Sequence, residues 1–127
     1  MKDNVTVKKL VKKDLPRINF SDIKNKILGK KYELSLVFVG KTKIQELNKN
    51  YRNKNEPTDI LSFQISKNEG EVFINPDMAR KKSKDFNQSY KKYLVYLVIH
   101  GLLHLKGMEH GSRMEKAEIK FLKKFNP

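Results

Sequence analysis

Hydrophobic and polar residues alternate in two stretches in the middle of the chain, and a period of two is typical of strands. Leu34, Leu36 and Phe38 occupy every second position of the first stretch. In the second, one side of the strand is expected to carry Leu61, Phe63 and Ile65. With two further stretches, the pattern predicts strands at residues 4–10, 34–39, 59–65 and 71–74.

Apolar residues three and four positions apart, with polar residues that cap helix starts, predict two helices in the first half of the chain. Ser21-Asp22 is expected to cap the first, which ends at Gly29, and Thr42 with Gln45 forms a capping box for the second. The stripes expected to face the core are Ile23, Ile27 and Leu28 in the first helix, and Ile44, Leu47 and Tyr51 in the second.

Three more helices are predicted in the second half. The residues Asn-Pro-Asp at 75–77 start a helix that should end near Phe86. Residues 89–106 are expected to form a buried helix, and Ser112 with Glu115 makes a capping box for the last one. Its inward face is predicted to carry Met114, Ala117, Phe121, Leu122 and Phe125.

The composition predicts one compact unit. The chain has 127 residues, of which 38% are hydrophobic, enough for a single core, so residues 1–127 are expected to form one domain. Its longest apolar run, residues 93–99, is far shorter than a membrane span, and the N-terminus does not resemble a signal peptide. Without cysteine, nothing requires an oxidising compartment, and the cytoplasm is the expected location.

All three histidines fall within eleven residues, at His100, His104 and His110. A separation of four places the first two on one face of a helix, one turn apart. Residues 93–99 could be a strand by propensity, but only a helix gives this pair a shared face. Gly107 allows the chain to reverse and return His110 to the same face. Three histidines with an open position predict a catalytic zinc site rather than a closed structural one.

The three ligands and the glycine match the spacing of the extended zincin motif, His-Glu-x-x-His-x-x-Gly-x-x-His. Gly101 stands where the zincins carry the glutamate that acts as general base. The sequence therefore predicts a metal site and argues against an ordinary protease.

The charge balance points to phosphates. Lys and Arg number 28 against 14 Asp and Glu, a net charge of +14, which is the electrostatic footprint of a nucleic-acid-binding protein. Each basic run, taken alone, also fits a solvated surface. The cations proposed to contact RNA are Lys49, Lys54, Arg80, Lys81, Lys82 and Lys84.

Three blocks of the sequence resemble one known family. The string HGLLHLKGMEH, residues 100–110, is similar to HGxLHLxGYDH, the signature of the YbeY family of bacterial endoribonucleases and ribosomal RNA maturation factors. LNKNYRNKNEPTDILSF, residues 47–63, resembles a family stretch that leads through Tyr-Arg to Pro-Thr-Asp-Val-Leu-Ser-Phe, and residues 70–76 resemble a third block. Together the blocks span most of residues 34–125.

The resemblance implies one Zn²⁺ per chain, bound by the three histidines, with Arg52 and His100 as catalytic residues. A guanidinium fits charge that develops on phosphoryl oxygens, although by sequence alone Arg52 would be a surface residue at a helix end. Asp59, Ser62 and Glu109 are expected near the site, the first two in either supporting or purely structural roles. Met108-Glu109 departs from the family's Tyr-Asp, and Glu71 replaces an aspartate.

The expected fold is α+β, a small mixed four-stranded sheet packed against about five helices, with the metal site on a central helix and the loop after it. The expected function is zinc-dependent, single-strand-specific RNA cleavage in 16S rRNA 3′ end maturation and small-subunit quality control. The expected partners are ribosomal RNA and the small subunit with its proteins, without membrane or nucleotide cofactor. Two alternatives stay open: a non-catalytic ribosome-assembly factor with structural zinc, and a metallopeptidase.

Overall fold

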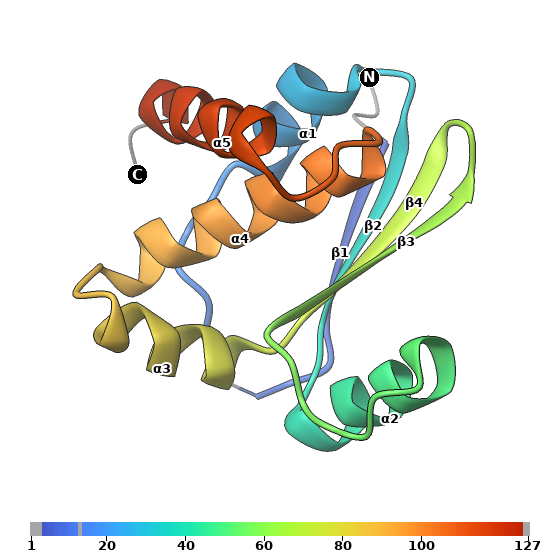
Figure 1. Cartoon of the computed structure of the whole chain (residues 1–127), viewed down its shortest axis with the longest axis vertical. Helices are drawn as coiled ribbons and strands as arrows, with labels where there is room; N and C mark the ends of the chain where they lie inside the picture. The colour runs from blue at the N-terminus through green and yellow to red at the C-terminus, as the bar shows by residue number, and fades with distance from the viewer. Residues whose placement is uncertain (1–3, 13, 126–127) are drawn as a thin grey trace.

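The computed structural model describes residues 4–12 and 14–125, and its sheet has four strands there (Figure 1). These are β1 (Val5–Lys9), β2 (Glu33–Phe38), β3 (Ile60–Ser66) and β4 (Glu69–Ile74). They lie in the order β1-β2-β4-β3, with β1, β2 and β4 parallel and β3 antiparallel to β4. The mixed four-stranded sheet expected from the sequence is confirmed.

The described residues also form five helices, α1 (Phe20–Leu28), α2 (Lys41–Arg52), α3 (Pro76–Asp85), α4 (Tyr90–Leu105) and α5 (Ser112–Phe125). Four of them, α1, α3, α4 and α5, lie on one side of the sheet, and α2 lies apart from them at the lower end in Figure 1. The α+β class is therefore confirmed, with α4 as the central helix of its layer.

The main core lies between the sheet and α4. Leu34, Leu36 and Phe38 of β2 are at most 2% exposed and belong to the same buried cluster as the apolar residues of α4. Because α4 is covered by the sheet and by three helices, it is apolar almost all round, as a buried helix should be. Ser89 caps it by accepting a hydrogen bond from the Lys92 backbone. The helix prediction for this segment is thus confirmed.

The cap predicted for α1 is wrong by two residues. Asn19 is the cap, and its side chain accepts a hydrogen bond from the Asp22 backbone. The chain turns into the helix before Phe20, whose ring packs against Phe38, so the helix begins earlier than Ser21-Asp22 implied. A polar residue before an apolar stripe does not by itself identify the cap, because a second polar residue nearby, here Asn19, can accept the same kind of hydrogen bond.

The two predicted capping boxes are wrong as well. Helix α2 begins at Lys41 after Gly40, without a side-chain cap, so Thr42 is already helical, and Gln45 hydrogen-bonds Asn55 instead. Helix α5 begins at Ser112 itself, and the Glu115 backbone donates to the Gly111 carbonyl. A glycine immediately precedes each helix, so that α2 begins one residue before Thr42 and α5 begins at Ser112 itself.

Two predicted core positions are exposed. Tyr51 is 69% exposed because only the first turns of α2 cover the end of the sheet, and its ring contacts Phe63 on the outer face. Ile65 is 56% exposed on the edge strand β3, next to an irregularity in the pairing with β4. By contrast, β4 extends two residues further back than predicted, because Gly70 is buried within it against the side chains of Tyr32 and Leu105.

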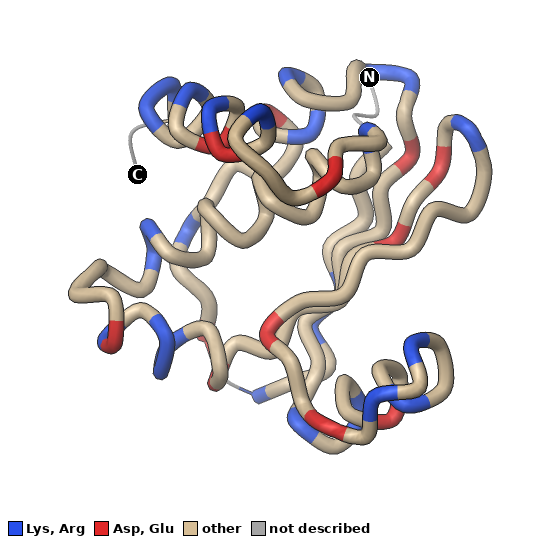
Figure 2. Tube along the Cα trace, in the orientation of Figure 1, with Lys and Arg blue, Asp and Glu red and all other residues tan. Residues whose placement is uncertain are grey.

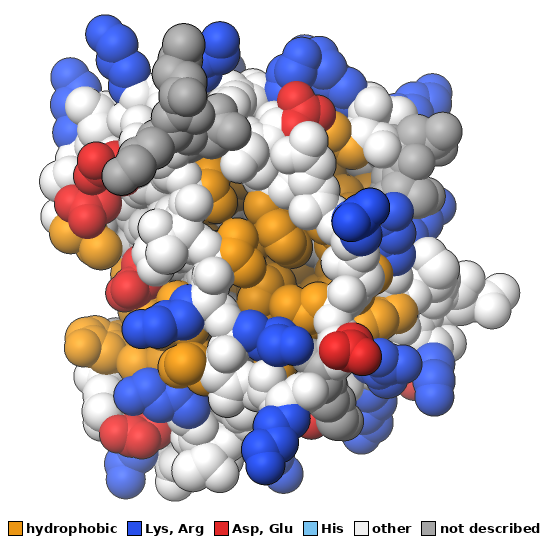
Figure 3. All heavy atoms as spheres, turned by 180° about the vertical axis from the view of Figure 1, so that it is seen from behind, with side chains coloured by type: hydrophobic (Ala, Val, Ile, Leu, Met, Phe, Trp, Pro, Cys, Tyr) orange, Lys and Arg blue, Asp and Glu red, His pale blue; other side chains and the backbone are white. Residues whose placement is uncertain are grey.

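The surface carries charge on most helices and apolar side chains in a few places. Lys and Arg residues are frequent along α2, α3 and α5 in particular (Figure 2). On the face seen from behind, hydrophobic side chains gather in the middle, bordered by Lys and Arg (Figure 3). The large hydrophobic side chains that are exposed are Val7, Leu10, Tyr51, Ile65, Phe86 and Ile119.

Candidate metal centre

The three histidines meet at the C-terminal end of α4, as the spacing predicted. His100 and His104 lie one turn apart, and their Nε2 atoms are 3.1 Å from each other. Gly107, with φ 104°, ends the helix by donating to the His104 carbonyl, and the chain then brings His110 back. One ligand nitrogen from each of the three histidines lies within 4.8 Å of the others.

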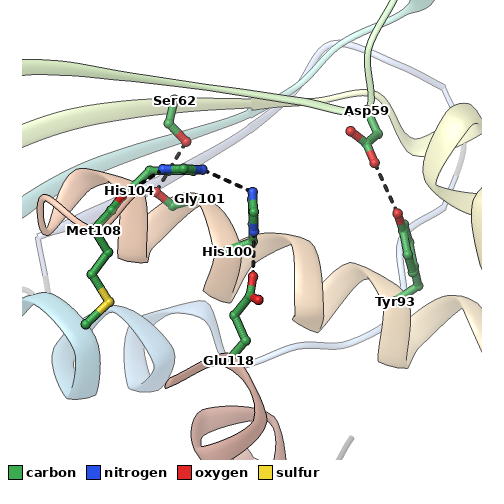
Figure 4. Close-up of polar contacts among 8 residues, drawn as sticks. All are labelled: Asp59, Ser62, Tyr93, His100, Gly101, His104, Met108 and Glu118. Atoms are coloured by element: carbon green, nitrogen blue, oxygen red, sulfur yellow. Dashed lines mark hydrogen bonds and ion pairs between the residues drawn. The ribbon is translucent and has the colours of Figure 1, made fainter. Parts of the chain in front are cut away.

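Two of the imidazoles are held from behind. Nδ1–H of His100 donates to the Glu118 carboxylate at 2.5 Å, and Nδ1–H of His104 donates to the Met108 carbonyl at 3.0 Å (Figure 4). Because both partners are acceptors, each Nδ1 carries a hydrogen, and in the neutral ring each Nε2 presents its lone pair to the cluster. This arrangement fixes the tautomer and ring orientation that metal ligation requires.

The cluster fits a zinc ion. When both rings are neutral, the two Nε2 lone pairs face each other at 3.1 Å, and a cation between them satisfies both. With Zn–N bonds of about 2.0–2.1 Å, tetrahedral ligands stand about 3.3 Å apart, close to the observed separation. Burial, and next the charge of His100, lowers the pKa of His104 and favours the neutral form that binds metal. Among the described residues the group has three protein ligands, which leaves a position open.

Glu118 is a charged residue at the site that the sequence analysis missed. It lies on α5 with an inward-facing carboxylate, and it is 8% exposed. The only local signal is a charge in line with Met114 and Phe121 on the apolar face of a helix. Nothing in the sequence indicates that α5 packs against α4 in the register that brings Glu118 to His100.

A pocket of about 480 Å³ opens over the histidines. Arg52, the last residue of α2, lines this pocket together with all three histidines, although α2 and α4 pack against opposite faces of the sheet. The remaining lining residues come from the start of β3 and the loop before it: Thr58, Asp59, Ile60, Leu61 and Ser62. The fold therefore brings the positively charged Arg52 side chain and the three candidate metal ligands to one cavity.

Ser62 and Gly101 mark a close approach of β3 to α4. The Ser62 hydroxyl donates to the Gly101 carbonyl at 3.3 Å, one residue from His100 (Figure 4). A Cβ at Gly101 would lie 2.8 Å from Ile60 Cδ1 and 2.9 Å from Ser62 Oγ. At the position that carries the general base in zincins, a side chain would therefore fit only if the ends of Ile60 and Ser62 moved away.

Asp59 connects β3 to the helices. Its carboxylate accepts hydrogen bonds from Tyr93 Oη and Lys82 Nζ, each at 3.2 Å, and its backbone carbonyl accepts one from Asn75. Burial, with the Asp59 charge beside it, raises the pKa of Tyr93, so the phenol remains a donor. Asp59 lines the pocket and at the same time fixes the segment from which the pocket wall is built.

The other predicted site residues lie outside the pocket. Glu109 is exposed and does not line it. Of the predicted RNA-contacting cations, Lys49 lies on α2 and Lys54 follows it, and both are exposed. On α3, Lys82 pairs with Asp59, while Arg80 covers the ring of Tyr90 at 4.3 Å. Lys81 and Lys84 are exposed on the same helix.

Fold and site together define an α+β protein in which three histidines that could hold a metal ion lie in an open pocket. The chain belongs to the YbeY family, because the family model described as endoribonuclease YbeY matches residues 2–126. Among the described residues, none of the helices has the length and apolar character needed to cross a membrane.

Known relatives agree with this assignment. The chain is 34% identical to the endoribonuclease YbeY of Staphylococcus carnosus over 99 residues, which are 68% of this chain and 65% of that protein. It is 36% identical to that of Oenococcus oeni over 122 residues, 87% of this chain and 76% of the relative. The fold is similar to the solution structure of TM1509 from Thermotoga maritima, with a TM-score of 0.69, 25% identity, and coverage of 94% of this chain and 87% of the other.

Proposed function

We propose that this protein is a zinc-dependent endoribonuclease that cuts single-stranded RNA. In the cell it would act in the cytoplasm on ribosomal RNA, at the 3′ end of 16S rRNA, and in quality control of the small ribosomal subunit. The observation that carries the proposal is the cavity shared by Arg52 and the three histidines. The relatives' name, endoribonuclease YbeY, supports RNA as the substrate.

Each group in the pocket has a role in this reaction. His100, His104 and His110 would hold the ion, which when bound supplies Lewis-acid chemistry for water or a phosphoryl oxygen. The Arg52 guanidinium, exposed at the end of α2, binds the phosphate and neutralises charge that develops on its oxygens. Glu118 keeps the His100 ring in orientation, and Asp59 keeps the β3 wall in place.

The surface cations supply the remaining affinity. Lys49 and Lys54 stand near Arg52, and Lys81 and Lys84 stand on α3. Contacts of this kind bind the phosphate backbone without reading its sequence, which suits a nuclease that accepts unpaired RNA.

Of the two alternatives, the metallopeptidase is the less favoured, because Gly101 lies where a peptidase needs its general base and packs closely against Ile60 and Ser62 of β3. If the protein is instead a non-catalytic ribosome-assembly factor, zinc would only stabilise the fold, and Arg52 would not be needed for function.

The test is RNA cleavage by purified protein with its metal content quantified, after metal removal, and after reloading with zinc. We expect cleavage to be lost on removal and restored by zinc, and Arg52→Ala to reduce kcat/KM by about 100-fold or more. Arg113→Ala, an exposed arginine at the start of α5, is the matched control and should retain activity. Equal cleavage by all forms would identify a contaminating nuclease and favour the assembly factor.

A further inference from the structure

A row of aromatic rings extends from the histidine cluster along α4 and ends at the surface. The ring centroids of His100 and Tyr96 are 5.9 Å apart, those of Tyr96 and Tyr93 5.7 Å, and those of Tyr93 and Phe86 6.0 Å. The last pair is stacked, with an angle of 19° between the planes. The row follows from helical spacing, because Tyr93, Tyr96 and His100 share one stripe of α4.

Phe86 is the exposed end of this row. It is the residue that ends α3, it is 63% exposed, and Tyr93 stacks on it. Stacking on Tyr93 accounts for the buried part of the ring and leaves most of its surface in water, which is unfavourable for a phenyl group without a further partner.

A second pocket, of about 270 Å³, lies at this end, lined by Phe86, Gln88, Tyr93 and Tyr96. One hydrogen bond connects it to the pocket over the histidines. Tyr93 lines the second pocket, and its hydroxyl donates to Asp59, which lines the pocket over the histidines (Figure 4). His100 follows Tyr93 by seven positions, which correspond to about 10 Å along the helix, a length that roughly three stacked nucleotides cover.

The segment that carries Phe86 is basic, whereas two acidic residues, Asp59 and Glu118, lie beside Tyr93 and Tyr96, which also line the second pocket. Between residues 80 and 92 the sequence carries one acidic residue, Asp85. The basic residues of the same segment are Arg80, Lys81, Lys82, Lys84, Lys91 and Lys92. An aromatic surface with cations beside it is the combination that binds single-stranded nucleic acid, because bases stack on the rings while phosphates meet the charges.

We propose that Phe86 and the pocket it lines bind an unpaired base of the RNA, a few nucleotides from the phosphate held at the metal centre. This subsite rests on the proposed function for its substrate class. It selects for single strands, since a base inside a duplex has no free face to stack on Phe86.

The test compares the binding of two oligonucleotides of equal length to the zinc-loaded protein, by fluorescence anisotropy. One is a single-stranded 2′-O-methyl RNA with 2-aminopurine near its middle, and the other is the same backbone with that base and its neighbours removed. We expect Phe86→Ala to weaken binding of the first by roughly 5- to 100-fold and to leave the second unchanged. Quenching of 2-aminopurine, which reports stacking, should be lost in the same variant.

Three controls separate stacking from other effects. Phe86→Trp should retain binding and quenching, whereas Phe86→Leu, which keeps an apolar surface without a π face, should lose the quenching. Ile119→Ala removes a side chain with similar exposure, 64%, on α5 and should change neither. Unchanged binding in Phe86→Ala, or equal losses for both oligonucleotides, would overturn the subsite.

Cleavage is measured separately with unmodified RNA. If the wild-type protein does not cut RNA but its binding depends on Phe86 and on the base, the nuclease proposal fails and the subsite stands. If the protein cuts RNA and Phe86→Ala binds both oligonucleotides as the wild type does, the subsite fails and the nuclease proposal stands.

Discussion

Glu118 contacts the nitrogen of His100 that faces away from the other histidines. A carboxylate in this position orients the ring and makes the opposite nitrogen a better donor to a metal, because it stabilises the positive charge that ligation draws onto the imidazole. The Met108 carbonyl does the same for His104 without a charge. The orientation of the histidine rings therefore depends on a side chain and a backbone carbonyl behind them.

Zinc affinity tests this role of Glu118. We expect Glu118→Gln to weaken zinc binding by about 10-fold and Glu118→Ala by up to about 100-fold, measured by competition with a chromogenic chelator. Glu115→Gln, an exposed glutamate on the same helix, is the control and should bind zinc like the wild type. Unchanged affinity in both Glu118 variants would show that the carboxylate has no influence on the metal.

Substitutions at Gly101 test whether packing against β3 disfavours a glutamate at this position. The ends of the Ile60 and Ser62 side chains can rotate away from a methyl group, so Gly101→Ala should cost about 1 kcal/mol or less in unfolding free energy. Gly101→Glu places a charged chain in a closed contact and should cost about 3 kcal/mol or more. Urea denaturation measures both. A Glu variant as stable as the wild type would contradict the packing argument.

At the scale of elements, the site depends on side-chain hydrogen bonds that hold β3 against α4. Asp59 at the start of β3 accepts hydrogen bonds from α3 and from α4, and Ser62 on β3 donates to α4. These links place one wall of the pocket over the histidine pair. Since β3 is an edge strand, hydrogen-bonded within the sheet only to β4, such side-chain links contribute more to its position than they would for a central strand.

Removal of the Tyr93 hydroxyl tests this connection. In Tyr93→Phe the Asp59 carboxylate loses a buried donor, and we expect a loss of about 1–2 kcal/mol in unfolding free energy. Tyr51→Phe, at a tyrosine that is 69% exposed, should be neutral. If urea titrations give the two variants equal stability, the hydrogen bond to Asp59 does not hold the strand.

At the scale of the whole molecule, a net charge of +14 is spread over several helices rather than over one (Figure 2). Such a surface attracts RNA from a distance and holds it by its backbone. The two pockets add specific groups to this surface, a guanidinium with three histidines in one and an exposed aromatic ring in the other.

Salt dependence measures the contribution of this charge. If about four phosphates are neutralised, raising KCl from 50 to 200 mM should weaken single-stranded RNA binding by about 50-fold. Anisotropy titrations across this range give the slope. An affinity that does not change with salt would contradict electrostatic binding, and it would leave base stacking as the main source of affinity.

The sequence by itself determined the features that depend on local periodicity. The alternation in β2, the buried helix α4 and the pair His100 and His104 follow from a period of two or from a spacing of four, which fix the face on which a side chain lies. The return of His110 needs only a glycine at the end of the helix. These predictions are confirmed because each concerns residues close together in the chain.

The tertiary structure alone decided which distant groups join them. Glu118 reaches His100 from 18 residues away, Arg52 enters the pocket from a helix near the other face of the sheet, and Phe86 stacks on Tyr93 across the connection between two helices. Packing also moved the starts of α1, α2 and α5 and exposed Tyr51. Such contacts depend on how helices and strands pack in register, a property of the whole chain that no local pattern contains.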